Sequence, residues 1–302
     1  MWRSTTLLLL LAVLPGHAGE RFLRLEVPSK FLPERRTVRI YLPDSYEKDQ
    51  GRRYPVLYLH DGQNLFSSAG TNICFGWGSW ELDRIVDELT RKDKMESVIL
   101  VGIDNSPARY LELCGRHHAV DTSTNTEFEN YSSFLIQELK PKIDSEYRTQ
   151  PAAARTGVMG SSMGGIGSII LAWEHPEVFG KAASLSGAFM VEKTNFLNTV
   201  LTPYKGPTQK TRLYLDSGAI DFTGGDDGRK LTAAVVDQFG RLGWGSNLMH
   251  YVDEKPLSLP ELQKSGLRQD KWSEAQTSQH NEFYWRLRVW RALTFLFPPP
   301  PS

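Results

Sequence analysis

The stretch ARTGVMGSSMGGIGSIILAWE, from Ala154 to Glu174, contains the clearest structural signal in this 302-residue sequence. Its first part, residues 154–159, is a short run that predicts a buried β-strand, and residues 163–174 have the pattern of a helix. Between them, GSSMG at residues 160–164 matches the pattern G-x-S-x-G. A serine in this context lies on a sharp turn, where glycines let the strand and the helix approach closely. The stretch therefore predicts Ser162 as a nucleophile.

The neighbouring residues support Ser162 rather than Ser161. If Ser161 were the nucleophile, Met159 and Met163 would occupy the two glycine positions of the pattern. With Ser162 as the nucleophile, the backbone N–H of Met163 opens the helix, where the helix dipole favours negative charge. We therefore expect this N–H to face the oxyanion that develops during attack on a carbonyl.

The rest of the chain has the pattern of an α/β protein. Two alternating segments, residues 22–27 and 37–42, predict antiparallel N-terminal strands. Buried strands follow at residues 55–60, 97–103, 154–159, 181–185, 211–215 and 248–252, with the clearest helices at 79–91, 129–143, 163–174, 228–241 and 280–297. This alternation predicts an α/β-hydrolase fold, with a mostly parallel central sheet and helices on both faces.

A serine hydroxyl needs a base, and the chain offers seven histidines. His280 is best placed, because it follows the last predicted strand and opens the C-terminal helix, as the order Ser, acid, His requires. His60 ends the strand before the expected oxyanion loop, so we expect it to line the site without acting as the base. His117 and His118 precede the serine and therefore come in the wrong order.

The acid should lie in the loop after the penultimate strand, which reads LYLDSGAID from Leu213 to Asp221. Asp221 is the preferred candidate, because Asp216 is expected to belong to the strand end. Asp226 and Asp227, in the glycine-rich turn that follows, are alternatives, although aspartates at such places also cap helices. The acid is therefore the least settled member of the predicted triad.

Several motifs resemble one family of esterases. They are YLHDGQNLF from Tyr58, VGIDN from Val101, GSSMGG from Gly160, HPEVFG from His175, LYLDSG from Leu213 and HNEFYW from His280. The chain thus resembles the family that includes esterase D, feruloyl esterase modules, enterochelin esterases and the mycobacterial antigen 85 acyltransferases. The resemblance covers nearly the whole mature chain. It implies Ser162, His280 and an acid near Asp221 as the triad, the N–H groups of Met163 and Gln63 as the oxyanion hole, and no cofactor.

The composition excludes some classes of protein and suggests a compartment. Lys plus Arg and Asp plus Glu are equal at 35 each, so no basic excess points to nucleic acid as a partner. Arg3, the apolar run 7–14 and the small residues 15–18 predict a cleaved signal peptide over residues 1–18, and no membrane span. The predicted enzyme domain is then residues 19–297, followed by a disordered, proline-rich tail at 298–302, and the protein is expected to be secreted.

Secretion has consequences for individual residues. It makes Cys74 and Cys114 candidates for a disulfide. It also makes Asn130, in an N-x-S sequon, a candidate glycosylation site if the host cell glycosylates. The pair His117-His118 with Glu112 lacks the H-E-x-x-H spacing, so we expect no metal site.

The predicted triad cleaves esters by default, through an acyl-enzyme that water resolves. His60, Trp80 and Trp285 are the expected substrate-binding residues, for a small-molecule, aryl or carbohydrate-linked ester. The long polar segment 254–279, which holds two prolines and precedes His280, is expected to be a lid or a disordered loop and could contain a short helix. Two alternatives stay open: an acyltransferase of the antigen 85 type, and a catalytically silent binding protein on the same fold.

Overall fold

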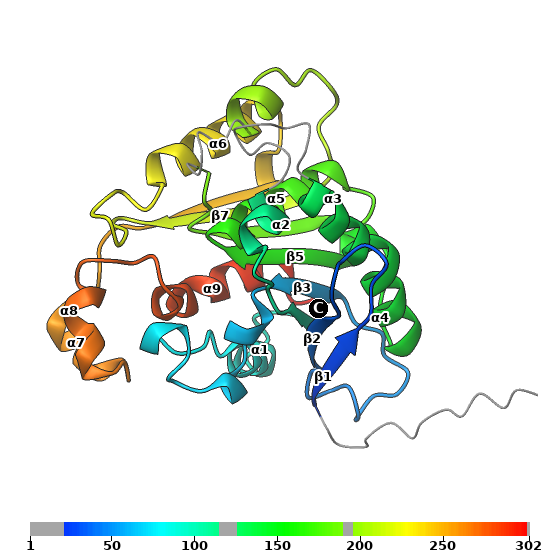
Figure 1. Ribbon diagram of the computed structural model, residues 1–302, viewed down its shortest axis with the longest axis horizontal. Helices are drawn as coiled ribbons and strands as arrows, with labels where there is room; N and C mark the ends of the chain where they lie inside the picture. Colours follow the sequence, from blue (N-terminus) through cyan, green and yellow to red (C-terminus); the bar gives the residue numbers. More distant parts are fainter. Residues whose placement is uncertain (1–20, 115–125, 190–195, 301–302) are drawn as a thin grey trace, which may run out of the picture.

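The computed structural model describes residues 21–114, 126–189 and 196–300 (Figure 1). Within these residues one eight-stranded sheet has the order β1-β2-β4-β3-β5-β6-β7-β8. The strands are β1 (Phe22–Val27), β2 (Arg36–Tyr41), β3 (Val56–His60), β4 (Ile99–Ile103), β5 (Thr156–Ser161), β6 (Lys181–Leu185), β7 (Arg212–Gly218) and β8 (Leu248–Asp253). β1 pairs antiparallel with β2, and β2 with β4, while β3 to β8 run parallel. The predicted α/β-hydrolase fold is confirmed.

Helices cover both faces of the sheet, as Figure 1 shows. On one face lie α2 (Arg109–Cys114), α3 (Thr126–Ser133), α4 (Lys140–Glu146), α5 (Met163–Glu174) and α6 (Arg229–Arg241), and on the other α1 (Leu82–Arg91) and α9 (Glu282–Leu296). Each face has its own hydrophobic core, because the central strands are buried on both sides. The runs PVLYLH and SVILVGI lack polar alternation for this reason.

The predicted helix 129–143 has an irregularity in the structure. α3 continues into a π-helical segment, Phe134–Leu139, before α4 begins. Pro141 lies in the first turn of α4, where it cannot donate a backbone hydrogen bond to the preceding turn. A wider π-turn just before the proline accommodates this missing donor. Asn130, the sequon asparagine, is exposed on α3.

The segment 254–279 contains regular structure. It holds α7 (Leu259–Lys264), a 3-10 turn (Gln269–Lys271) and α8 (Trp272–Ala275), so the short helix allowed by the sequence is confirmed. A small third core joins the segment to α9 and to Trp77. The hydroxyl of Tyr284 accepts the N–H of Leu257 at 2.8 Å and donates to the carbonyl of Ala275 at 2.7 Å. The segment is thus anchored on the helix that follows His280, while its role as a lid stays a prediction.

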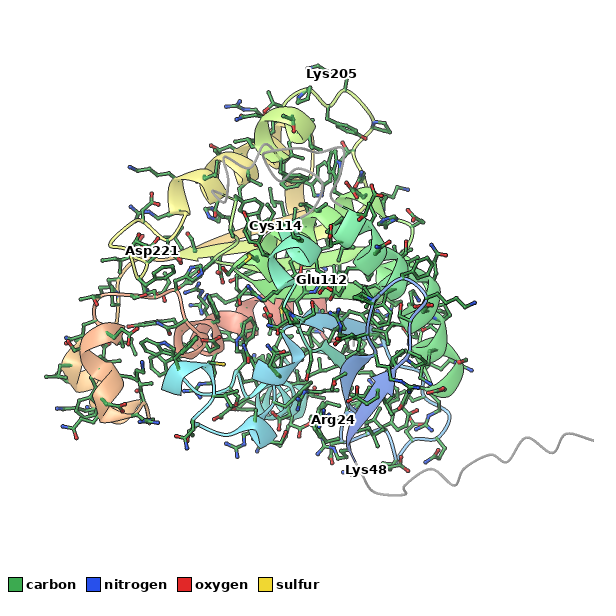
Figure 2. The ribbon with its side chains drawn as sticks, in the orientation of Figure 1. Arg24, Lys48, Glu112, Cys114, Lys205 and Asp221 are labelled. Carbon is green, nitrogen blue, oxygen red and sulfur yellow. The ribbon has the colours of Figure 1, made fainter. Side chains whose placement is uncertain are left out.

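The predicted disulfide is wrong: Cys74 and Cys114 are not bridged. Different elements hold the two side chains. The thiol of Cys74, in the 3-10 turn Cys74–Gly76, contacts the carboxylate of Glu282 at the start of α9. Cys114 is buried at the end of α2, which lies over the opposite face of the sheet near the centre of Figure 2. Sequence and compartment alone could not reveal this separation.

The two ends of the chain lie largely outside the part that the structure describes. Residues 1–20, where the signal peptide is predicted, and the last two residues lie outside the described part. Residues 298–300, at the start of the predicted tail, belong to no helix or strand. Within the described ranges, no helix combines the length and apolarity needed to cross a membrane.

Candidate active site

The turn between β5 and α5 has the geometry that the sequence predicts for a nucleophile. Ser162 has φ 54° and ψ −120°, a backbone conformation that residues other than glycine rarely adopt. A Cβ atom on Gly160 would lie 2.7 Å from the carbonyl carbon of Gly164, so the turn requires glycine there. The Ser162 N–H donates to Leu185 at 2.9 Å, and its carbonyl accepts the Ala188 N–H at 2.9 Å. The serine is therefore held in a strained turn by the neighbouring strand.

The imidazole of His280 is held by a buried aspartate. Its Nδ1 lies 2.5 Å from Oδ1 of Asp227. The Asp227 side chain has no exposed surface, whereas the His280 side chain is 13% exposed. Burial opposes ionisation of Asp227, but its contacts with His280 and the charge of Arg288 hold the pKa of the carboxyl below its ordinary value. Asp227 is therefore ionised at neutral pH and orients the imidazole.

This contact corrects the preferred acid of the sequence prediction. Asp221 turns its carboxylate to its own loop, where Oδ1 accepts the N–H groups of Thr223 at 2.8 Å and Gly225 at 2.9 Å. Figure 2 shows Asp221 at the outer edge of the molecule. Asp226, the other alternative, accepts the N–H of Lys230 at 3.4 Å in the first turn of α6. Asp227 is the partner of His280, because the glycine-rich turn folds back onto the end of β7.

The strand register brings these groups to one edge of the sheet. Ser161 pairs with Leu185 of β6, and Leu185 pairs with Asp216 of β7. The next residues, Ser162 and Ser186, therefore lie side by side at the carboxyl ends of β5 and β6. Ser186 Oγ donates to Asp227 Oδ2 at 2.5 Å. The site thus lies at the C-terminal edge of the central strands, where open α/β sheets bind their ligands.

The two predicted oxyanion donors, the backbone N–H groups of Met163 and Gln63, each lie near the start of a helical turn. Met163 is the first residue of α5, and the first N–H groups of a helix have no acceptor within it. Gln63 lies in a 3-10 turn, Gly62–Asn64, which directly follows β3 and Asp61. In this turn Asn64 donates to the carbonyl of Asp61 at 2.9 Å. The N–H of Gln63 precedes this bond, so it lies at the open start of the turn.

Polar contacts with Asp61 and Asn105 hold the Gln63 loop in place. Arg109 of α2 forms a two-pronged ion pair with Asp61, at 2.6 and 2.7 Å. Asn105 donates its side-chain amide to Asp61 at 2.8 Å, and its backbone N–H to Gln63 Oε1 at 3.1 Å. Asp61 itself has φ 58°. The loop is therefore tied to α2 and to the end of β4 before any substrate binds.

His60 lies in a different place from the one the sequence predicts. It is 1% exposed, with Nδ1 2.9 Å from the hydroxyl of Tyr131 on α3, so it does not line the surface of the site. A buried position at the carboxyl end of a central strand is sufficient to explain this, because both faces of β3 are covered. Burial lowers the pKa of His60 to about 4.

This burial makes stability depend on pH. The unfolded chain binds a proton at His60 below an ordinary pKa of 6.5, whereas the native protein stays neutral there until about pH 4. The free energy of unfolding should therefore fall by about 3 kcal/mol as pH drops from 6.5 to 4. Urea unfolding of wild type and His60→Gln at several pH values measures this term. A variant with the full wild-type pH dependence would contradict it.

Trp80 and Trp285 are packing residues rather than the expected substrate contacts. They are 2% and 6% exposed, and their rings lie 5.8 Å apart in the core beneath the site. Trp285 also packs edge to face against His280 at 5.1 Å, and its Nε1 donates to Ser186 at 3.1 Å. Trp285 therefore packs against the imidazole on its buried side.

The exposed aromatic neighbour of His280 is Phe222, which the sequence prediction missed. Its ring is 72% exposed and lies 5.7 Å from the imidazole. Phe222 is a large apolar residue in a turn of glycines and aspartates, and this contrast is the sequence signal that could have pointed to an exposed aromatic near the site. His117 and His118, which the sequence prediction set aside, lie outside the described residues.

Comparison with known proteins bears on the family and the fold of the chain. A family model described as "Putative esterase" matches residues 29–289, which is most of the chain. The chain belongs to this esterase family. The uncharacterized protein YbbA of Bacillus subtilis is 25% identical over 158 residues, which cover 51% of this chain and 57% of YbbA. The chain thus spans about half the length of the curated relatives that it matches.

Solved structures of two esterases share the fold of this family member. A ferulic acid esterase has a TM-score of 0.64 and 17% identity, covering 91% of this chain and 97% of its own. The enterobactin esterase of Shigella flexneri has a TM-score of 0.67 and 18% identity, covering 92% of this chain and 59% of its own. At identities this low, the TM-scores show a common fold alone.

Proposed function

We propose that this member of the esterase family is a serine hydrolase that cleaves a carboxylic ester through Ser162, His280 and Asp227. The observation that carries the proposal is the 2.5 Å contact between His280 Nδ1 and the buried carboxylate of Asp227. Ser186, which follows β6 beside the strained turn at Ser162, donates to the same carboxylate, so the imidazole and the serine lie at one edge of the sheet. A base held by an acid beside an activated serine is the arrangement that acyl transfer requires.

The first half of the reaction forms an acyl-enzyme. Ser162 Oγ attacks the ester carbonyl carbon while Nε2 of His280 takes the hydroxyl proton. The N–H groups of Met163 and Gln63 stabilise the oxyanion of the tetrahedral intermediate, and Asp227 stabilises the imidazolium. The C–O bond to the alcohol then breaks, and the imidazolium gives its proton to the departing alcohol oxygen.

The second half returns the free enzyme. Water attacks the acyl carbonyl, and His280 takes one of its protons. The new tetrahedral intermediate collapses, Ser162 leaves with the proton from the imidazolium, and a carboxylic acid is released. Asp227 stays ionised throughout. Burial raises the pKa of its carboxyl, but the contact with His280 contributes most to lowering it, and the pKa lies below its ordinary value.

The position of Phe222 suggests where the alcohol portion of the ester binds. Because His280 protonates the leaving oxygen, a side chain beside the imidazole contacts the leaving alcohol. Phe222 packs its ring against His280 and leaves most of its surface open to solvent. The ring offers apolar area to a flat or ring-shaped alcohol. Esterase names among the structural neighbours, one for ferulic acid and one for enterobactin, support an ester substrate without choosing between these two.

Phe222→Ala should lower kcat/KM for 2-naphthyl acetate by roughly tenfold, because the variant loses apolar contact with the leaving group. It should change kcat/KM for methyl acetate by less than about twofold, since the acyl group is the same and the alcohol is too small for contact. Trp290→Ala is the matched control, because Trp290 is also an exposed aromatic, 43% exposed, but lies far along α9. Equal losses on both esters would rule out an alcohol site at Phe222.

A panel of esters tests the proposed function as a whole. Aryl acetates, feruloyl esters and longer acyl esters are incubated with wild type and Ser162→Ala, and the released acid is measured. Hydrolysis by wild type alone supports the proposal, and an equal rate with both proteins would refute it. Added alcohol acceptor distinguishes transfer from hydrolysis: an acyltransferase would form the new ester in preference to the acid.

We also propose that the protein is secreted. The support is the apolar run 7–14 after Arg3, followed by small residues. Expression in a secreting host, followed by intact-mass measurement of the exported protein, tests this. A mature chain that starts near residue 19 is expected. Retention of the full-length chain inside the cell would contradict the proposal.

A further inference from the structure

Arg288 is a buried cation near the proposed triad, and the reaction steps above do not use it. It lies on α9 and is 2% exposed. Its Nε lies 3.0 Å from Asp216, and its two Nη atoms lie 3.9 Å from Asp227 and from Asp253. Burying a charged group is costly, and an apolar side chain would serve helix packing as well or better. The location of Arg288 therefore points to an electrostatic role.

The hydroxyl of Ser186 links Arg288 to the proposed acid. Ser186 Oγ accepts hydrogen bonds from Trp285 Nε1 at 3.1 Å and from Nη2 of Arg288. A serine oxygen has two lone pairs and one proton. Because both lone pairs are occupied, the single O–H is directed at the remaining partner, Asp227 Oδ2, at 2.5 Å. Arg288 therefore sets the direction in which Ser186 donates.

The donors on Asp227 leave one oxygen for the imidazole. Oδ2 receives the Ser186 hydroxyl and the N–H of Gly218. Oδ1 contacts His280 Nδ1. The backbone of Ser186 is itself fixed, with φ 46° and its N–H bonded to the carbonyl of Asp216 at 3.0 Å. The network thus determines which carboxylate oxygen meets the histidine, and from which direction.

We propose that Ser186 and Arg288 are positioning residues that hold Asp227 ionised and turned toward His280. This inference rests on the proposed function, because it concerns the acid of the proposed triad. Both residues are buried, Ser186 at 0% and Arg288 at 2% exposed, so neither is placed to contact substrate. Ser186 donates its hydroxyl hydrogen bond to Oδ2 of Asp227, and Arg288 places a fixed positive charge 3.9 Å from the same oxygen.

The charged surroundings determine how the pH dependence should respond. The groups facing this cluster are Asp216 and Tyr214 from β7, Asp253 from β8, Arg291 and Glu282 from α9, and the pair Asp227 and His280. Burial raises the pKa of Asp216 and of Asp253, whereas the contacts of Asp227 outweigh its burial and lower its pKa. Without Ser186 or Arg288, the negative charge of Asp227 would be less well compensated, so we expect the acid limb of the rate profile at higher pH.

The test measures kcat and KM for p-nitrophenyl acetate against pH in the full-length protein. Ser186→Ala should lower kcat by about 10- to 100-fold, leave KM within about twofold, and move the acid limb of the profile to higher pH. Arg288→Met should move the acid limb in the same direction by roughly one pH unit or more. Arg288→Lys, which keeps the charge, should restore most of the wild-type acid limb.

Two buried pairs elsewhere supply matched controls. Thr211 accepts the indole N–H of Trp244 at 3.2 Å, as Ser186 accepts that of Trp285, so Thr211→Val removes a similar buried acceptor. Arg36 is 5% exposed and pairs with Glu112 at 2.7 Å, so Arg36→Met removes a similar buried cation. Both controls are expected to lose stability in thermal unfolding with the wild-type acid limb unchanged.

The outcomes separate the two proposals. If Ser162→Ala is inactive while Ser186→Ala and Arg288→Met match the controls in kcat and acid limb, the positioning role is refuted and the proposed function stands. If Ser162→Ala keeps wild-type turnover, the proposed function itself fails. Should Arg288→Met not fold, Ser186→Ala decides the question, because it removes only one hydroxyl oxygen and keeps the Cβ atom.

Discussion

Ser162→Ala should lower kcat for p-nitrophenyl acetate on the order of 10⁵-fold, with the fold intact. The alanine lacks the hydroxyl that would form the acyl-enzyme, so the oxyanion donors and His280 alone remain to assist attack by water. Ser162 is half-buried in a turn that the backbone contacts with Leu185 and Ala188 maintain, and these contacts do not involve its hydroxyl. Steady-state kinetics, with active-site titration of the wild type, measures the effect.

Ser162→Gly is a useful companion to the alanine variant. It should be equally inactive, but its free energy of unfolding should exceed that of Ser162→Ala by about 1 kcal/mol. The reason is that φ 54° and ψ −120° strain any residue that carries a Cβ atom. Substantial hydrolysis by either variant would show that another residue attacks the ester.

Asp227→Asn should lower kcat by about 10³- to 10⁴-fold. The amide keeps the size of the side chain but places a neutral group against His280 Nδ1, so the imidazole loses its orientation and the imidazolium its counter-charge. Asparagine also tolerates the φ of 52° at this position, which favours a folded variant. Kinetics and thermal unfolding of the same preparations separate catalytic loss from misfolding.

The other two aspartates provide matched controls for this substitution. Asp221→Asn and Asp226→Asn should each stay within about threefold of wild-type kcat, because their carboxylates bond to their own turns. Some loss of stability at Asp221 is expected, since its Oδ1 accepts several loop donors. A large catalytic loss at Asp221, with Asp227→Asn near wild type, would restore the acid that the sequence alone favoured.

Local sequence was sufficient for the features that local chemistry decides. The apolar runs predicted the central strands closely, and residues 181–185 match β6 at both ends. The turn at Ser162 was predictable because its glycines, its strand and its helix are contiguous in the chain. Chain order favoured His280 as the base, and this role stays a prediction. The structure joins His280 to Asp227 across 53 residues, a distance that no local pattern covers.

Features that depend on long-range packing were predicted less well. Asp221, Asp226 and Asp227 lie in one short stretch with similar neighbouring residues. Only the path of the turn after β7 decides which of them meets His280. His60 looked like a site residue because it ends the strand before the oxyanion loop, and Trp80 because its segment lies near the proposed site, yet both are buried. Cys74 and Cys114 looked like partners because secretion was expected, but they lie on different elements.

The sequence by itself determined the α/β fold and the glycine-bearing turn at Ser162, because strand and helix periodicity and glycine-dependent turns are encoded in neighbouring residues. Tertiary structure alone decided which aspartate meets His280 and which residues contact that aspartate. Ser186 and Arg288 lie 102 positions apart, and each resembles an ordinary residue of its own segment. They share the proposed role only when the residue after β6 packs against α9, because burial there removes water and leaves Asp227 as the acceptor for the Ser186 hydroxyl.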